Sequence, residues 1–256
     1  MNIDLIKKNI QRDLNQKVAE FMEEDDIVTR FGNPQIAYVD ADHKVFDQLF
    51  MENYTDHPKK IYRPGKCIIT YFLPWAEEVE PGTEAWDRAF TEAMWLSMEL
   101  NRTIRKDLNA VGRLHSLLCD MMDWNPRQLR EEWDFRLTAA LGGLGEIGPC
   151  GSFRAFNAEP RFSRIGGRCS GIITDGLYAG QLPEDDEGVA NRLTDERAEK
   201  VLEMARSMNC AKAGTACPGG AIGTDGAIDR AKCQEHCLTI NENIPCPDVC
   251  GMCYKK

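Results

Sequence analysis

The sequence predicts an α/β or α+β layer domain followed by a small cysteine-rich module. Up to about residue 180, segments with helical spacing of apolar residues alternate with short runs of β-branched and aromatic residues. Beyond an acidic linker that starts at Gln181, the composition changes, and the last forty-seven residues hold seven of the eleven cysteines. We therefore expect the layer domain at 1–185 and the cysteine module at 186–256.

The elements expected in the layer domain follow from local patterns in chain order. Ile6, Ile10, Leu14 and Val18 recur at helical spacing among charged residues and predict an amphipathic entry helix. The predicted helices span residues 4–24, 42–53, 83–108, 126–141 and 193–208. The predicted strands span residues 35–41, 66–74, 113–119, 152–157 and 169–175. Pro126 is expected in the first turn of its helix, and Asp134 on the solvated face of the same helix.

Composition and the N-terminus narrow the class of protein. The first residues contain no apolar segment and no small-residue cleavage site, so we expect a cytoplasmic chain with reduced thiols. The number of cysteines is odd, and 256 residues with 43% apolar composition can bury a core without disulfides. No run of about eighteen uncharged apolar residues occurs, so no membrane span is expected. A net charge of −10 argues against a nucleic-acid partner bound through its phosphates.

The cysteines of the module are spaced for an iron–sulfur cluster. A [4Fe–4S] cluster takes four thiolates, usually several from one tight loop and one from a remote Cys-Pro. Cys250 and Cys253 form a Cys-Gly-Met-Cys loop, in which the glycine lets backbone N–H groups approach the negative cluster. Cys217 precedes a proline and supplies the remote sulfur. The sequence therefore predicts that these three cysteines are cluster ligands.

One cluster is expected, although bacterial ferredoxins of this kind hold two. Their run C-x2-C-x2-C-x3-C-P, aligned with Cys217 as its fourth cysteine, places two of the other three positions on Ser207 and Ala213. The reciprocal run would need a cysteine four positions after Cys253, and the sequence given ends at Lys256. One ligand set is therefore complete, and the other is not.

The fourth ligand and the metal leave alternatives. Cys233 is the ligand that we expect, with Cys237 and Cys246 in reserve. Zinc also takes four thiolates, and one Cys-x-x-Cys is a valid zinc knuckle, but zinc ribbons generally carry two such knuckles. The sequence favours an iron–sulfur protein that transfers electrons. The alternative is a non-catalytic interaction protein whose C-terminus is folded by zinc or by a structural cluster.

A glycine-rich segment, Gly143-Leu-Gly145-Glu-Ile-Gly148, matches the pattern G-x-G-x-x-G. A dinucleotide site of this type needs a strand before the glycines and a helix after them, whereas here a helix is predicted before them. The segment is therefore either a flexible turn between a helix and a strand, or a loop that lies beside a flat cofactor.

Several motifs together resemble the epoxyqueuosine reductase family and its shorter relatives from anaerobes, in the same order over roughly residues 30–256. They are Ala140–Gly148, Cys169–Asp175, Ala216–Ile222, Asp229–Cys233 and Cys250–Cys253. The resemblance implies a nitroreductase-like, cobalamin-binding domain before a ferredoxin-like module with two [4Fe–4S] clusters. Electrons would pass through the clusters to the corrinoid cobalt, which reduces the substrate.

The resemblance implies further partners, and the sequence departs from it in three places. Implied partners are a ferredoxin or flavodoxin as electron donor and a corrinoid or small molecule, with Gly143, Gly145 and Gly148 beside the corrinoid. The departures are the incomplete second cluster, the lack of the family's helical-repeat extension, and the lack of its Asp-Thr-Gly-Pro stretch with the acidic proton donor. Asp123 and Asp134 are the nearest acids, so no catalytic residue is assigned.

Overall fold

The computed structural model describes residues 3–110, 116–118, 133–148, 151–158, 166–177, 193–208, 217–225 and 229–240. Its centre is a four-stranded sheet in the order β1-β2-β6-β3, in which each strand is antiparallel to its neighbours. The strands are β1 (Gln35–Asp40), β2 (Cys67–Pro74), β6 (Gly167–Thr174) and β3 (Ser116–Leu118). Antiparallel pairing with helices on both faces makes the layer domain α+β.

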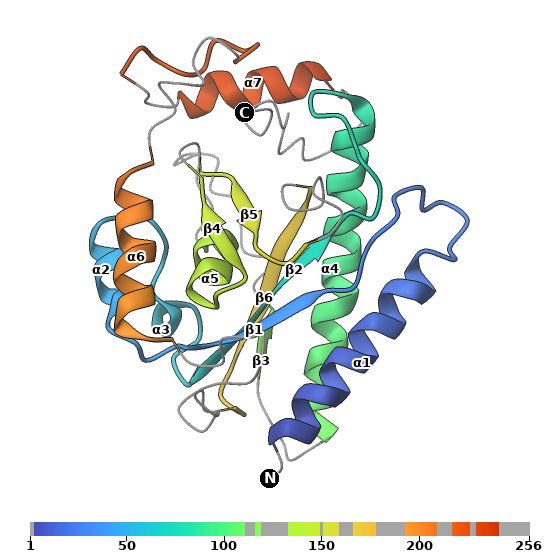
Figure 1. The fold of residues 1–256 in the computed structure, drawn as a ribbon, viewed down its shortest axis with the longest axis vertical. Helices are drawn as coiled ribbons and strands as arrows, with labels where there is room; N and C mark the ends of the chain where they lie inside the picture. Colours follow the sequence, from blue (N-terminus) through green and yellow to red (C-terminus); the bar gives the residue numbers. More distant parts are fainter. Residues whose placement is uncertain are drawn as a thin grey trace.

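Two helices cover one face of the sheet and three cover the other (Figure 1). On the first face lie α1 (Ile3–Phe21) and α4 (Glu84–Ala110). The second face carries α2 (Val45–Met51), α5 (Phe135–Leu141) and α6 (Asp195–Arg206), while α3 (Pro58–Ile61) follows α2 in the chain. A small hairpin of β4 (Gly145–Ile147) and β5 (Phe153–Ala155) adjoins α5 and α6. The last of the described helices, α7 (Arg230–Ile240), crosses the end of the molecule opposite the N-terminus.

The central strand β2 is buried along its whole length, because both sides of the sheet are covered. Its side chains alternate between the two cores: Ile68 and Phe72 pack with α2 and α5, whereas Ile69 and Tyr71 pack with α1 and α4. This position explains the continuous apolar run that the sequence shows at 66–74. The predicted buried strand is confirmed.

Most predicted elements of the layer domain are confirmed, with shifts at their ends. In α1 the apolar positions of the predicted stripe are all buried. The helix predicted to start at Pro126 instead begins at Phe135, because Asp134 is extended and caps it; residues 126–132 lie outside the described part. Of the strand predicted at 113–119, the described part is β3. The linker that starts at Gln181 also lies outside it.

The structure contains three elements that the sequence pattern does not predict: β4, α3 and α7. The expectation of a flexible turn at the glycines is wrong in part, because β4 forms there and pairs with β5. Neither α3 nor α7 follows from the apolar periodicity of the sequence.

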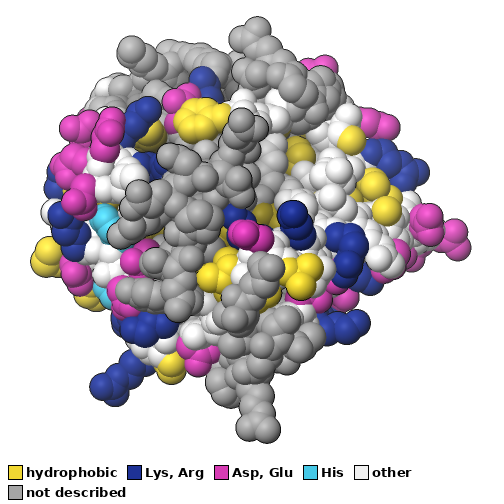
Figure 2. Space-filling model, turned by 60° about the horizontal axis from the view of Figure 1, so that its bottom comes forward, with side chains coloured by type: hydrophobic (Ala, Val, Ile, Leu, Met, Phe, Trp, Pro, Cys, Tyr) yellow, Lys and Arg dark blue, Asp and Glu magenta, His cyan; other side chains and the backbone are white. Residues whose placement is uncertain are grey.

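None of the described helices is long and apolar enough to cross a membrane. On the face shown in Figure 2, acidic and basic side chains are interspersed around the described surface, with smaller hydrophobic patches between them.

Candidate metal centre at the Cys217 turn and α7

The sulfur of Cys217 accepts a backbone hydrogen bond within a tight turn. The N–H of Ala221 donates to Cys217 Sγ over 3.3 Å, and the N–H of Gly220 donates to the Cys217 carbonyl over 3.2 Å. Gly220 has a φ of +59°, in the left-handed region that glycine adopts without strain. A backbone N–H directed at sulfur stabilises a thiolate, which is the form that binds metals. This turn therefore suits Cys217 as a metal ligand.

The turn is fixed against α7 at the glycine that follows Pro218. A methyl group added at Gly219 would lie 2.6 Å from Cβ and 2.9 Å from Cγ of His236, so only glycine permits this approach. At the other end of the turn, the N–H of Asp229 donates to the carbonyl of Ala221 over 2.7 Å. The Asp229 carboxylate accepts from the N–H of Lys232 at the start of α7. The turn and the helix thus form one packed unit.

Two cysteines lie one helical turn apart on α7. Cys233 is partly exposed, whereas only 4% of Cys237 is exposed. At about 100° per residue, Cys233 lies about 60° around the helix from His236, and Cys237 lies about 100° from it on the same side. Since His236 marks the side of α7 that contacts the Cys217 turn, Cys233 is the better placed of the two to share a metal with Cys217. His236 itself packs against Gly219, at the contact between α7 and the Cys217 turn.

The rest of the expected ligand set lies outside the described residues. This applies to Cys250, Cys253, the reserve Cys246 and the leftover Cys210. Within the described ranges, no three histidine, cysteine or acidic side chains gather as a metal site requires. The structure thus brings Cys217 together with the helix that carries Cys233, and all four ligands stay predictions.

The glycines of the G-x-G-x-x-G segment are accounted for by packing of the chain on itself. Gly143 ends α5 with a φ of +78°. A side chain at Gly145 would collide with the carbonyl of Arg154 across the β4–β5 pair, and one at Gly148 would lie 2.8 Å from Ser152 Oγ. The helix expected before the segment is α5, and a hairpin rather than a helix follows it. Their place beside a cofactor stays a prediction.

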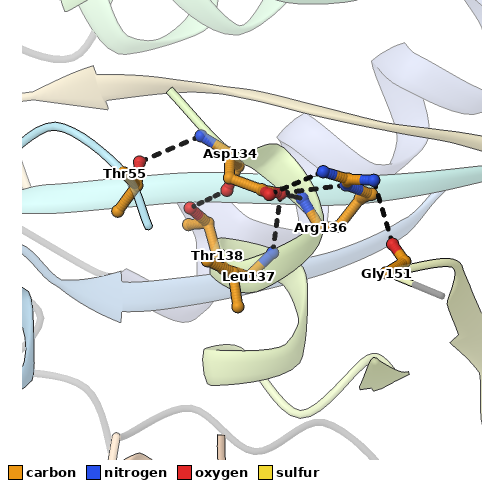
Figure 3. Close-up of polar contacts among 6 residues, drawn as sticks. All are labelled: Thr55, Asp134, Arg136, Leu137, Thr138 and Gly151. Carbon is orange, nitrogen blue, oxygen red and sulfur yellow. Dashed lines mark hydrogen bonds and ion pairs between the residues drawn. The ribbon is translucent and has the colours of Figure 1, made fainter. Parts of the chain in front are cut away.

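Asp134 organises a polar network at the start of α5 (Figure 3). Its carboxylate accepts from the backbone N–H groups of Arg136 and Leu137, and its own N–H donates to Thr55 Oγ1 over 3.0 Å. The guanidinium of Arg136 binds both carboxylate oxygens, at 3.1 and 2.7 Å, and donates to the carbonyl of Gly151 at 2.9 Å. The expectation that Asp134 lies on a solvated helix face is wrong, because this carboxylate is a helix cap that is largely buried.

This network shows that Asp134 is a poor proton donor. Burial on its own raises the pKa of the carboxyl, but the Arg136 charge and the hydrogen bonds from Arg136 and Leu137 outweigh burial and hold the pKa below its ordinary value. Asp134 is therefore a carboxylate near neutral pH. Sequence reasoning missed the role of Arg136; an aspartate directly before an apolar helical segment is the signal for the cap.

The cysteines of the sheet have a different environment from Cys217. Cys67 is fully buried in β2, and burial raises the pKa of its thiol, so it stays protonated. Cys169 in β6 packs in the core beside Phe72 and Phe153. Cys67 is thus a buried core residue, while Cys119 and Cys150 lie outside the described residues.

Comparisons with known proteins give one structural likeness. No family model matches the sequence, and no curated protein matches it. Among solved structures, epoxyqueuosine reductase from Streptococcus thermophilus matches at 15% identity with a TM-score of 0.49. The alignment covers 96% of this chain and 64% of that one, so this chain spans less than two thirds of the reductase. A likeness of this size carries no argument about activity.

Proposed function

We propose that this protein is an iron–sulfur electron-transfer protein that serves a reduction. Cys217, Cys233, Cys250 and Cys253 would hold one [4Fe–4S] cluster, which supplies one-electron transfer when bound. The observation that carries the proposal is the Cys217 turn, in which a backbone N–H is bonded to the sulfur and a glycine fixes the turn on α7. The resemblance of the cysteine motifs to the epoxyqueuosine reductase family also supports it.

The donor set of the described residues fits a cluster better than a disulfide or an inert thiol. The Ala221 N–H offers a hydrogen bond to a negatively charged sulfur, and Cys217 is half-buried, which limits the access of water. Cys67 shows the contrast, because its thiol is buried in an apolar core. An electron donor such as a ferredoxin or flavodoxin, and an acceptor that is a corrinoid or a small molecule, complete the proposal.

Metal analysis tests the cluster directly. Protein purified without oxygen should be brown and contain about four iron atoms and four sulfide ions per chain. After reduction with dithionite, its electron paramagnetic resonance spectrum should show a spin-½ signal. Colourless protein with stoichiometric zinc would favour the non-catalytic alternative and contradict the proposal. About eight iron atoms would contradict the single cluster.

Substitution of single cysteines tests the ligand set. Cys217→Ser and Cys233→Ser should each remove most of the iron, because a hydroxyl group is a much weaker ligand than a thiolate. Cys237→Ser should keep it. Cys67→Ala is the matched control, since that thiol lies in the core, and its folded protein should retain full iron content. Loss of iron in Cys237→Ser but not in Cys233→Ser would show that the fourth ligand is wrong.

A separate titration tests the corrinoid. Addition of cob(II)alamin to the iron-loaded protein should change the cobalt spectrum from the base-on to the base-off form if the layer domain binds it. No spectral change would remove the corrinoid from the proposal and leave the cluster untouched. The described residues offer no donor set that we assign to this cofactor.

A further inference from the structure

Trp95 is the only described tryptophan that is exposed to solvent. It is 48% exposed, whereas each of the other described tryptophans is at most 2% exposed, namely Trp75, Trp86 and Trp133. The side of α4 that packs in the core is made of other residues, such as Leu96. A tryptophan that stays half exposed adds little apolar burial to the fold, and tryptophan is common at the centres of protein interfaces. Trp95 is therefore available for contact with another molecule.

The loop between α1 and β1 is held on α4 one helical turn before Trp95. The buried carboxylate of Glu92 accepts from the backbone N–H groups of Val28 and Thr29, over 3.3 and 2.7 Å. Glu92 and Trp95 are three residues apart, so they are neighbours on one side of the helix. The Val28 side chain is 59% exposed at this contact. We call the exposed apolar surface that Trp95 and Val28 provide the Trp95 surface.

The acidic residues of this loop come just before Val28. Four of them are consecutive and exposed, and within the described part of the chain none forms an ion pair: Glu23, Glu24, Asp25 and Asp26. The N–H of Ala76 donates to the carbonyl of Arg30 over 2.7 Å, which joins the loop to a second acidic segment after β2. Residues 20–33 and 74–88 each carry five acidic residues and one basic residue, a net charge of −4 apiece, against −10 for the whole chain. Most of the net negative charge thus lies around the Trp95 surface.

The basic side chains near the Trp95 surface are already bonded. Ion pairs join Lys17 to Glu20 at the end of α1 and, on α4, Arg88 to Glu84 and Arg102 to Glu99. Arg30, the basic residue of the loop, donates to the carbonyl of Met22 over 2.8 Å. The four loop carboxylates are therefore left to attract a positive charge from outside the chain.

We propose that the Trp95 surface binds a positively charged partner protein, whose lysines or arginines face the acidic loop while an apolar side chain packs on Trp95. Charge complementarity selects this partner, and a cation can also lie over the face of the indole ring. Nucleic acids and anionic membranes carry phosphates, and a second copy of this chain carries the same acidic loop, so all three are repelled. Because Glu92 already fixes the loop, binding costs little ordering. The proposal does not depend on the cluster.

A synthetic peptide tests the charge of the partner. The probe is a peptide in which arginine and leucine alternate, and its counterpart has glutamate in place of arginine. Calorimetric titration of the full chain should show binding of the arginine peptide, weaker as salt is added, and no binding of the glutamate peptide. Failure of the arginine peptide to bind would overturn the proposal. Binding to phosphatidylglycerol vesicles or to a DNA duplex would overturn the choice of partner.

Truncation of the tryptophan tests the place of binding. Trp95→Ala should weaken binding of the arginine peptide about tenfold, because it removes the apolar anchor. Met51→Ala is the matched control, since Met51 is also an exposed apolar residue but lies at the end of α2, on the other face of the sheet. This variant should bind as the wild type does. Equal affinities of the two variants would overturn the assignment to Trp95.

A change of charge tests the acidic loop. The combined substitutions Glu23→Gln, Glu24→Gln and Asp25→Asn should weaken binding about fivefold and reduce its dependence on salt. The control makes the same change of charge on the exposed side of α6, with Glu196→Gln, Glu199→Gln and Glu203→Gln, and should leave the affinity unchanged. An equal loss in both triple variants would show attraction to the net charge of the whole protein, and would overturn the proposed surface.

Discussion

Two partly buried aspartates on different helices show opposite pKa shifts. Asp134 caps α5, and Asp107 lies near the end of α4, facing Asp13 of α1. Burial raises the pKa of both carboxyls. Asp134 is surrounded by N–H donors and a guanidinium, which reverse the effect, whereas the carboxyl of Asp13 adds to it at Asp107. The neighbours, rather than burial, decide the sign.

The Asp13–Asp107 pair needs a proton to form a hydrogen bond. Oδ2 of Asp107 is buried and finds no hydrogen-bond donor among the described residues, because a carboxylate offers none. Burial, followed by the charge of Asp13, raises the pKa of Asp107 to about 6, although Lys106 and Arg12 act in the opposite direction. Asp13 itself bonds to Arg12, and its pKa is lowered. Asp107 is therefore the member of the pair that holds the proton.

The two sites stabilise the fold in opposite pH ranges. The folded protein binds the Asp107 proton more tightly than the unfolded chain does, so this contribution is complete below pH 3.8 and is lost as the pH rises through about 6. Asp134 has a lowered pKa, so its contribution is present above pH 3.8 and is lost as the pH falls through the lowered value. Between pH 3.8 and about 6, a rise in pH removes the stabilising contribution of Asp107 and leaves that of Asp134 intact, so stability measurements can separate the two sites.

The largest effect is expected at Asp134. Asp134→Ala removes a helix cap and leaves the Arg136 charge without its carboxylate, so the free energy of unfolding should fall by about 3 kcal/mol. Thr194→Ala is the matched control, because Thr194 caps α6 through the N–H of Arg197 without a paired cation; it should cost about 1 kcal/mol. Urea unfolding followed by circular dichroism measures both. Equal losses would mean that the ion pair at Asp134 adds nothing.

An opposite and smaller effect is expected at Asp107. Asp107→Asn removes the like charge and lets an amide donate to Asp13, so at pH 8 the free energy of unfolding should rise by about 1 kcal/mol, a value reduced for partial exposure. At pH 5 the gain should be smaller, because the wild-type carboxyl is then mostly protonated. The same urea experiment at both pH values measures it. A loss of stability at pH 8 would contradict the like-charge interpretation.

The smallest effect on stability is expected at Asp13. Asp13→Asn relieves Asp107 but breaks the pair with Arg12, and the two effects oppose each other within about 0.5 kcal/mol. The pKa of Asp107, measured from its carboxyl carbon by nuclear magnetic resonance, should fall but stay above 3.8, since burial remains. An Asp107 pKa that stayed at about 6 would show that burial alone raises it.

The layer domain could be predicted from the sequence because its elements repeat a clear period. The stripe from Ile6 to Val18 has helical spacing, and all four of its residues are buried in α1. The run at 66–74 is apolar on both faces, as a central strand must be. The apolar pattern predicts the start of α5 too early, because the cap at Asp134 is formed by one side chain, which has less weight in a local pattern than an apolar run.

For the candidate site, the sequence predicts the type of ligand but not how the segments that carry the ligands pack together. Cysteine spacing points to the sulfur ligands, since ligands of one metal need not share a periodic element. The joint between Gly219 and His236 could not be read from the sequence, because it depends on a turn and a helix meeting in space. α7 has charged and polar residues on all sides, so periodicity gives no signal for it. The role of Arg136 also depends on two segments that meet in space, because its partner Gly151 is fifteen residues away in the chain.

The pairing of β2 with β6 has a consequence for how the protein is made. Oγ1 of Thr70 donates to the carbonyl of Ser170, 100 residues later, and β6 is the partner of both β2 and β3. During synthesis, β2 emerges from the ribosome long before the strand that covers its edge. Until then, it exposes unpaired backbone and an apolar surface that favours aggregation. Such distant pairing also makes folding slow, so a chaperone that binds the nascent chain should raise the yield of folded protein.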